Sequence, residues 1–90
     1  RAVRFGRGSG PAIAAERIGS VLHIAIPLGW VSSVHAELRA LTTSSTLEFD
    51  IRDLGSRNGT YIERQAVSGA ARLRQGEIFE VGRAFFTVRT

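Results

Sequence analysis

Cysteine and lysine are both absent from this 90-residue sequence. Without cysteine the chain has no disulfide framework, no thiolate metal site and no thiol nucleophile, which fits a reducing compartment. Its two histidines stand outside any zinc motif, so we expect neither a metal nor a cofactor. Long apolar runs are absent too, because the longest covers residues 24–28 and a membrane helix needs about 20. We therefore expect a soluble, cytoplasmic protein with no membrane partner.

The length of the chain allows one folding unit. A chain of 90 residues with no second block of apolar sequence is too short for two hydrophobic cores. At a mass of 9.8 kDa, folding buries roughly 64% of the surface of the unfolded chain, which is enough for a modest core. We expect a single domain over residues 1–90.

Positive charge comes from arginine alone. The twelve basic residues are all arginines and face eight acids, so the net charge is +4. A planar guanidinium group binds phosphate or carboxylate through two parallel hydrogen bonds, which favours anionic partners. Arginine together with abundant alanine and glycine fits an effect of genome composition equally well. The arginines form no run in the sequence, so an anion site must be assembled by folding.

Short apolar segments separated by glycine, serine and asparagine predict an all-β fold. The expected strands cover residues 2–5, 21–26, 35–41, 46–52, 60–62, 78–81 and 85–89. Leu47, Phe49 and Ile51 alternate with polar residues, as in a half-buried antiparallel strand. Residues 11–17 alone have a helical composition and predict a helix of at most about two turns. The many short strands indicate an antiparallel β-sandwich.

The glycine-rich segment at residues 6–10 follows the first expected strand. Its glycine spacing does not match a dinucleotide-binding turn, and no βαβ unit follows in so short a chain. A flexible loop is the simpler interpretation. Arg7 between Gly6 and Gly8 nevertheless suits an anion clamp, because the flanking glycines let the backbone curve toward a ligand.

A hydroxyl and an imidazole lie close together in the segment Ser32-Ser33-Val34-His35. No strand-to-helix elbow surrounds these serines, and no acid is placed to orient the imidazole, so we do not expect an enzyme. A histidine that enters a strand after serines more often braces a loop by hydrogen bonds to the backbone. The hydroxyls of Ser32 and Ser33 are then free to contact an anion.

Residues 53–60 form a polar stretch between two expected strands, with Asn58-Gly59 as a tight-turn signal. A plain hairpin accounts for this turn by itself, but Arg57 and two hydroxyl residues crowd into the same loop. Residues 73–82, which an aromatic segment follows, predict by themselves a strand pair that closes the core.

Taken in order, these segments resemble the forkhead-associated (FHA) domain, a phosphothreonine-peptide recognition module, over nearly the entire chain. That family has a strand ending in Gly-Arg, a Ser-x-x-His-Ala element, a Ser-x-Asn-Gly-Thr turn, a Leu-x-x-Gly-Asp/Glu-x-Ile stretch and a final aromatic strand. The matching segments here are Gly6-Arg7, Ser32-Ser33-Val34-His35-Ala36, Ser56-Arg57-Asn58-Gly59-Thr60, Leu73-Arg74-Gln75-Gly76-Glu77-Ile78 and Phe85-Phe86. The chain looks most like the versions attached to bacterial regulators, including enhancer-dependent transcription activators and proteins acting beside Ser/Thr kinases.

The resemblance implies a β-sandwich of about ten or eleven short strands with the recognition loops at one end, in a domain of a larger regulatory protein. By position in the motifs, it implies that Arg7 and Ser32 hold the phosphate of a phosphothreonine. Ser33 and Arg57 would lie beside the phosphate, and Asn58 would bond the peptide backbone. Four residues would brace the loops: Gly6, His35, Gly59 and Thr60. The implied partner is a phosphothreonine-containing protein, the substrate of a Ser/Thr kinase.

Two features depart from the family pattern. The family often has arginine after the first serine of Ser-x-x-His, whereas this chain has Ser33, which removes one cation from the rim. The interval between Arg7 and Ser32 is also longer than usual, with residues 9–20 as the apparent insertion. Arg17 in this insertion therefore competes with Arg7 for the phosphate. Trp30 is an unusual loop residue that either contacts the peptide or packs over the base of the loop.

Two other classes of function fit less well. A basic β-domain can bind nucleic acid, but single-strand binders interleave exposed aromatics with cations, and the seven aromatics here fall mostly at core positions of strands. We therefore expect no direct binding of nucleic acid. A docking or oligomerisation domain that ignores phosphate is the better alternative, because it keeps the sandwich and leaves the Arg7 and Ser32 pocket unused.

Overall fold

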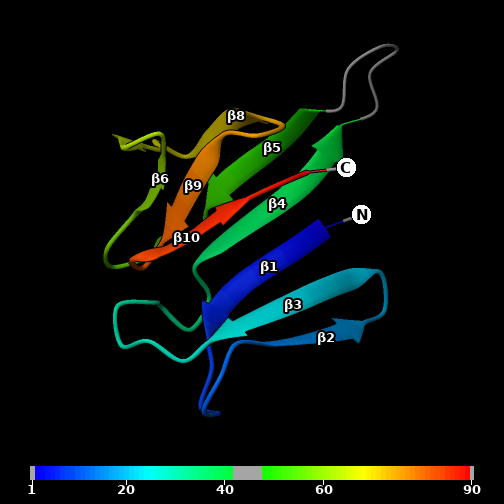
Figure 1. Ribbon diagram of the computed structural model, residues 1–90, viewed down its shortest axis with the longest axis vertical. Helices are drawn as coiled ribbons and strands as arrows, with labels where there is room; N and C mark the ends of the chain where they lie inside the picture. Colours follow the sequence, from blue (N-terminus) through cyan, green and yellow to red (C-terminus); the bar gives the residue numbers. More distant parts are fainter. Residues whose placement is uncertain (1, 42–47, 90) are drawn as a thin grey trace.

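All regular structure in the described part of the chain is β-strand. The computed structural model describes residues 2–41 and 48–89, and Figure 1 traces their path. The strands are β1 (Ala2–Arg7), β2 (Ala14–Ile18), β3 (Val21–Ile26), β4 (Ala36–Leu41), β5 (Glu48–Asp53), β6 (Thr60–Ile62), β7 (Gln65–Ala66), β8 (Ala70–Arg74), β9 (Ile78–Val81) and β10 (Ala84–Thr87). The all-β prediction is confirmed. Thr46 and Leu47, which were expected to begin the strand seen as β5, lie outside the described residues.

The helix predicted for residues 11–17 is wrong. The structure places β2 there, and β2 pairs antiparallel with β3 through a tight turn at Gly19 and Ser20. Gly19 has a φ of +63°, a left-handed conformation that suits a short hairpin. A helix of about two turns is unstable by itself, so pairing with the apolar β3 outweighs the helical preference of the alanines. Within residues 2–41 and 48–89, no helix could cross a membrane.

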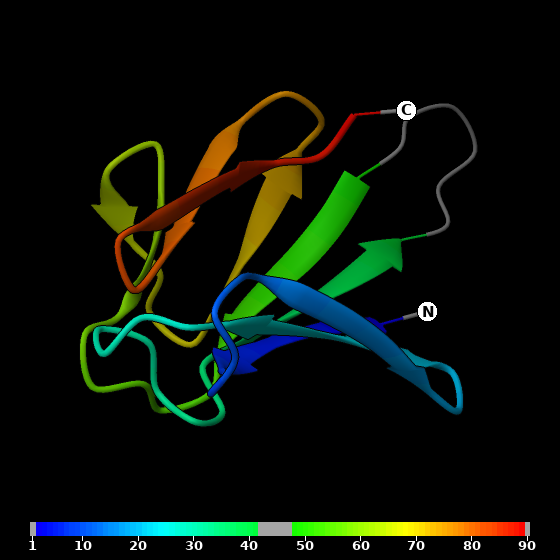
Figure 2. The same ribbon diagram turned by 60° about the horizontal axis from the view of Figure 1, so that its bottom comes forward.

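The strands form two sheets, which Figure 2 shows as separate layers. The larger sheet has the strand order β2-β3-β1-β4-β5-β8, and the smaller sheet has the order β10-β9-β6-β7. Within the described ranges, neighbouring strands run antiparallel except β1 and β3, which are parallel and place Gly6 opposite Ala25. The predicted antiparallel sandwich is therefore confirmed, with one parallel pair that the sequence pattern did not indicate.

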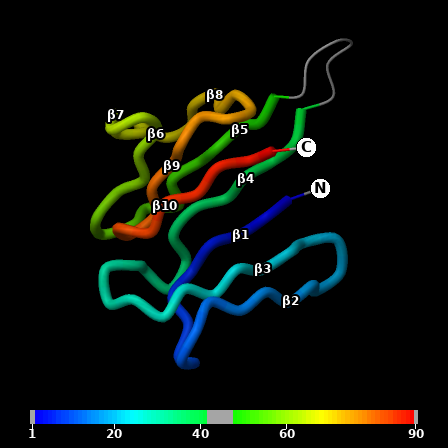
Figure 3. The backbone as a smooth tube through the Cα atoms, viewed as in Figure 1, coloured from blue at the N-terminus to red at the C-terminus, as the bar shows by residue number. Residues whose placement is uncertain are grey.

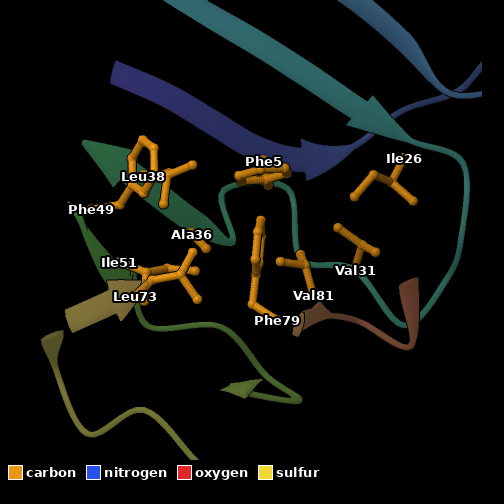
Figure 4. Close-up of a cluster of buried hydrophobic side chains, with 10 residues drawn as sticks. All are labelled: Phe5, Ile26, Val31, Ala36, Leu38, Phe49, Ile51, Leu73, Phe79 and Val81. Carbon is orange, nitrogen blue, oxygen red and sulfur yellow. The ribbon is translucent and has the colours of Figure 1, made fainter. Parts of the chain in front are cut away.

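Side chains from the facing surfaces of the two sheets form the core, shown in Figure 4. Its buried members are Phe5, Ile26, Val31, Ala36, Leu38, Phe49, Ile51, Leu73, Phe79 and Val81. The rings of Phe5 and Phe79 meet edge to face with their centroids 5.5 Å apart. Burying an aliphatic or aromatic side chain of this size contributes about 1.5–3 kcal/mol to folding. Val31 belongs to the loop between β3 and β4, so the core also anchors that loop.

The connections that follow β3, β5 and β9 gather at one end of the sandwich, next to the end of β1. Figure 3 shows this gathering, with the N- and C-termini lying away from it. The strands leading into these loops are fixed by the core, so the loop residues are held on a rigid base.

Candidate functional site

Loops from both sheets meet around one pocket, which we call the loop-end pocket. It has a volume of about 230 Å³ and is lined by Arg7, Gly29, Trp30, Val31, Ser32, Ser33, Arg57 and Asn58. All five residues that the sequence predicts to contact a ligand are in this lining. Arg17 is not, because it lies on β2, the outermost strand of the larger sheet. The geometry therefore favours Arg7 over Arg17 as the arginine of the site.

Arg7 is the last residue of β1, and its side chain is exposed at the rim of the loop-end pocket. Its backbone N–H donates a hydrogen bond to the carbonyl of Ser32 (2.9 Å), which ties the end of the strand to the loop. Its Nη2 donates to Ser33 Oγ (3.3 Å). No carboxylate of the described residues pairs with Arg7, so its positive charge and most of its N–H donors are available to an anion.

Ion pairs neutralise arginines mainly on the larger sheet. The pairs join Arg4 and Arg39 to Glu37, Arg52 to Asp50, and Arg72 to Glu48. The hydrogen bond from Arg4 is the main cause that holds the pKa of Glu37 below its ordinary value. At the loop end, by contrast, Arg7, Arg57 and Arg83 have no carboxylate partner in residues 2–41 and 48–89. Arg7 and Arg57 therefore bring unpaired positive charge to the lining of the loop-end pocket.

Gly6 stands where the loop containing Ser33 crosses β1. A Cβ atom at this position would lie 2.2 Å from the carbonyl oxygen of Ser33. That oxygen belongs to the backbone, so the clash could be relieved only by moving the loop. The absence of a side chain at Gly6 lets the loop lie directly on the strand and brings Ser32 and Ser33 beside Arg7.

His35 is fully buried, and both nitrogens of its ring bond to the backbone of the loops. The N–H of Ser32 donates to Nδ1 (3.0 Å), so Nδ1 is the unprotonated nitrogen. Nε2 then carries the proton and donates to the carbonyl of Gly59 (2.8 Å). The backbone N–H of His35 donates to the carbonyl of Phe5, and its carbonyl accepts from the N–H of Leu54, both at 2.9 Å. One residue thus joins β1, the loop before β4 and the turn before β6.

Two of the predicted ligand residues also join the loops to one another. Ser32 Oγ accepts a hydrogen bond from the backbone N–H of Arg57 (2.9 Å) and keeps its own proton to donate. Asn58 Nδ2 donates to the carbonyl of Trp30 (2.8 Å), which leaves its Oδ1 and a second N–H for other partners. The polar groups of the pocket are therefore positioned before any ligand arrives, which reduces the entropy lost on binding.

Asp53, at the end of β5, organises the turn before β6, although it is not among the residues that the sequence predicts for the site. One carboxylate oxygen accepts from the hydroxyls of Ser56 and Thr60, and the other accepts from the N–H groups of Gly55 and Ser56. Ser56 Oγ accepts in turn from the N–H of Gly59 (2.9 Å). An aspartate followed by serine three residues later is the sequence signal for such a turn, because its side chain can bond the following backbone.

The pKa of Asp53 lies below its ordinary value of 3.8. Burial by itself raises the pKa, but hydrogen bonds from the hydroxyls of Ser56 and Thr60 and from two backbone N–H groups stabilise the charged form more strongly. A carboxyl group whose pKa is lowered by folding stabilises the folded state fully above its ordinary pKa. This stabilisation is lost as the pH falls through the lower pKa of the folded state.

Asp53→Asn is expected to lower the melting temperature by several degrees at neutral pH. An amide cannot accept from all four donors, and buried hydrogen bonds left unmade cost about 1–3 kcal/mol. The difference from the wild type should shrink as the pH falls below about 4, because the unfolded wild type is protonated there first and the folded wild type only at its lower pKa. Thermal melts across this range check the prediction, with Asp50→Asn on the same strand as the control. A difference that stays constant at every pH would contradict it.

Trp30 is 47% exposed and carries the side chain of Arg83 on its ring. The guanidinium carbon lies 3.7 Å from the ring centroid, a cation–π contact that sequence reasoning did not predict. Arg83 belongs to the turn between β9 and β10, where a Cβ on Gly82 would lie 2.5 Å from Val31 Cγ2. Trp30 thus packs against the neighbouring turn while part of its ring stays open beside Asn58.

One comparison with known proteins shows the family, and another shows the fold. A family model described as FHA domain matches residues 3–82. The structure of the FHA domain of the CT664 protein from Chlamydia trachomatis is similar, with a TM-score of 0.67 and 21% identity, and the match covers 97% of this chain and 74% of that chain. A search of curated proteins gives no match.

Two structures of Nbs1 from S. pombe are also similar. The structure of its FHA/BRCT-repeat domain and that of the Nbs1-Ctp1 complex each have a TM-score of 0.71 and 21% identity. The matches cover 94% and 93% of this chain, but only 27% and 29% of the Nbs1 chains. At this identity the structural likeness supports the fold.

Proposed function

The chain belongs to the FHA domain family, and from this we propose that it is a protein-interaction module that binds phosphothreonine peptides in the loop-end pocket. The observation that carries the proposal is the environment of Arg7, which is exposed, has no acidic partner in the described ranges and stands beside the Ser33 hydroxyl. A phosphorylated threonine has a charge of about −1.5 to −2 and three acceptor oxygens. The guanidinium fork, the serine hydroxyls and the charge of Arg57 match these acceptors.

Each residue of the site has a proposed part in binding. Arg7 forms a bidentate pair with the phosphate, and Ser32 and Ser33 donate their hydroxyl protons to it. Arg57 attracts the phosphate from the rim, and Asn58 bonds the backbone of the peptide with its remaining amide groups. Four residues keep the loops in place without touching the ligand: Gly6, His35, Gly59 and Thr60.

We further propose that the partner is a substrate of a Ser/Thr kinase and that recognition serves signalling or transcription regulation in the bacterial cytoplasm. This context rests on the resemblance of the sequence to FHA domains attached to bacterial regulators and on its lack of cysteine. One of the similar structures is that of a complex, Nbs1 with Ctp1, which supports a role in binding another protein. In this proposal the module recognises its partner and catalyses no reaction.

A docking or oligomerisation domain that ignores phosphate is the second candidate. One observation favours it: Phe85 on β10 and Ile78 on β9 are 67% and 50% exposed, and neither lines the loop-end pocket. Large exposed apolar side chains of this kind can mark a protein contact. Such a contact would bind a partner equally well with or without a phosphate.

Calorimetry with paired peptides separates the two candidates. A phosphothreonine peptide selected from an oriented library is expected to bind with micromolar affinity, about −8 kcal/mol. The same peptide with plain threonine should bind at least about a hundredfold more weakly. A peptide with aspartate in place of the phosphothreonine should also bind only weakly, because a single carboxylate has fewer acceptor oxygens and less charge than a phosphate. Equal affinity for the phosphorylated and plain peptides would support the docking domain instead.

A further inference from the structure

A second cavity adjoins the loop-end pocket on the other side of Arg7, and we call it the β1–β3 notch. It has a volume of about 180 Å³, and its lining includes Gly6, Arg7, His23, Ala25, Ser33 and Val34. Arg7 and Ser33 belong to the linings of both cavities, and the hydrogen bond between their side chains lies between them. The notch thus adjoins the site proposed for the phosphate and shares Arg7 and Ser33 with it.

Small residues form the floor of the notch, where Gly6 also leaves room for the carbonyl of Ser33. Gly6 and Ala25 are opposite each other on the parallel strands β1 and β3. Neighbours of Gly6 and Ala25 in sequence, Phe5 and Ile26, are buried in the core, so strand alternation directs residues 6 and 25 to the outer face. A larger residue at position 25 would extend over this face and fill the cavity.

Val34 forms an apolar wall of the notch. Its side chain is 57% exposed, although the adjoining loop-end pocket is lined mainly by polar residues. The loop around it is fixed, because Gly6 lets Ser33 lie on β1 and the N–H of His35 donates to the carbonyl of Phe5 (2.9 Å). An exposed β-branched side chain on a fixed loop offers apolar surface that a ligand can cover without ordering the protein.

From this arrangement we propose that the β1–β3 notch binds an aliphatic side chain of the phosphopeptide, such as leucine or isoleucine, within two residues of the phosphothreonine. The proposal rests on the proposed function. Alternate residues of an extended peptide point to the same side and are about 7 Å apart, so one peptide can reach both adjoining cavities. A cavity of about 150 Å³ can hold a benzene molecule, so a notch of about 180 Å³ has room for an aliphatic side chain.

The test keeps the phosphothreonine constant and changes one flanking residue at a time. Leucine is compared with glycine at each of the three positions before and after the phosphothreonine, by calorimetry on the wild-type chain. Each buried methylene changes affinity roughly fourfold, so a leucine that buries about two such groups in the notch is expected to bind at least about tenfold more tightly than glycine at a position within two residues. Equal affinities for leucine and glycine at all these positions would overturn the proposal.

Variants of the protein then test whether the preference for leucine arises in the notch. Ala25→Leu fills the notch and should abolish the preference for leucine while phosphorylated peptides still bind more tightly than plain ones. Ala70→Leu is the matched control, because Ala70 lies on β8 at the opposite edge of the same sheet and should keep both preferences. Val34→Ser should reduce the leucine preference as well and serves if Ala25→Leu does not fold.

The outcomes separate a failure of the proposed subsite from a failure of the proposed function. A preference for leucine that survives Ala25→Leu and Val34→Ser would place the aliphatic side chain elsewhere and overturn the subsite alone. Wild-type chain that binds phosphorylated and plain peptides equally would overturn the proposed function and the subsite with it.

Discussion

Replacing Arg7 by alanine is expected to lower the affinity for a phosphothreonine peptide at least about tenfold. The variant loses a charge-assisted bidentate contact, which contributes ~1.5–3 kcal/mol. Its melting temperature should stay close to that of the wild type, because the side chain of Arg7 is exposed and its backbone bond to Ser32 is kept. Titration calorimetry and thermal melts of the same preparation check both parts of the prediction.

Arg17→Ala is the matched control for this experiment. Arg17 is also an exposed arginine on a strand, but it lies on β2 and outside the loop-end pocket. The affinity of Arg17→Ala for the phosphothreonine peptide should stay within about threefold of the wild type, because an exposed charge outside the pocket contributes ~1 kcal/mol or less. The reverse order, with Arg17→Ala weak and Arg7→Ala unaffected, would identify Arg17 as the phosphate clamp and contradict the site described above.

His35→Ala is expected to have the largest effect on stability. The substitution removes a fully buried ring and leaves the N–H of Ser32 and the carbonyl of Gly59 without their partner. Two partly buried polar groups left unpaired, together with the lost ring packing, cost about 2–4 kcal/mol. For a domain of this size the melting temperature should therefore fall by roughly 10 °C or more. Binding should weaken as well, because the two loops that carry Ser32 and Arg57 lose their common brace.

His23→Ala provides the control for His35. His23 lies on β3 and has no hydrogen bond to these loops in the described residues, so its loss should change the melting temperature by only a few degrees. An unchanged melting curve for His35→Ala, together with abolished binding, would place His35 in contact with the ligand and contradict its role as a brace.

The β-sandwich could be predicted because apolar and polar residues alternate along its strands, which shows which side of each strand is buried. Phe49 and Ile51 point into the core from β5, as their alternation with polar neighbours indicates. The β2 segment could not be predicted in this way. Its alanines favour a helix locally, and only the hairpin with β3 makes it a strand. The parallel pairing of β1 with β3 likewise depends on the whole sheet.

Five residues that line the loop-end pocket could be predicted because each stands in a short motif that resembles the FHA family: Arg7, Ser32, Ser33, Arg57 and Asn58. Contacts between distant segments carry no such signal. The cation–π contact of Arg83 with Trp30 joins the turn after β9 to the loop after β3, and neither segment indicates the other. The hydrogen bonds of Asp53 could have been predicted from the sequence, because all of its partners lie within seven residues of it.

The most direct measurement of the central claim is a calorimetric cycle with two proteins and two peptides. Wild type and Arg7→Ala are each titrated with one peptide in its phosphothreonine and plain threonine forms. The account predicts that phosphorylation raises the affinity of the wild type at least about a hundredfold, and that Arg7→Ala reduces this gain at least about tenfold. An equal gain in both proteins would contradict the role of Arg7, and no gain in the wild type would contradict phosphothreonine recognition itself.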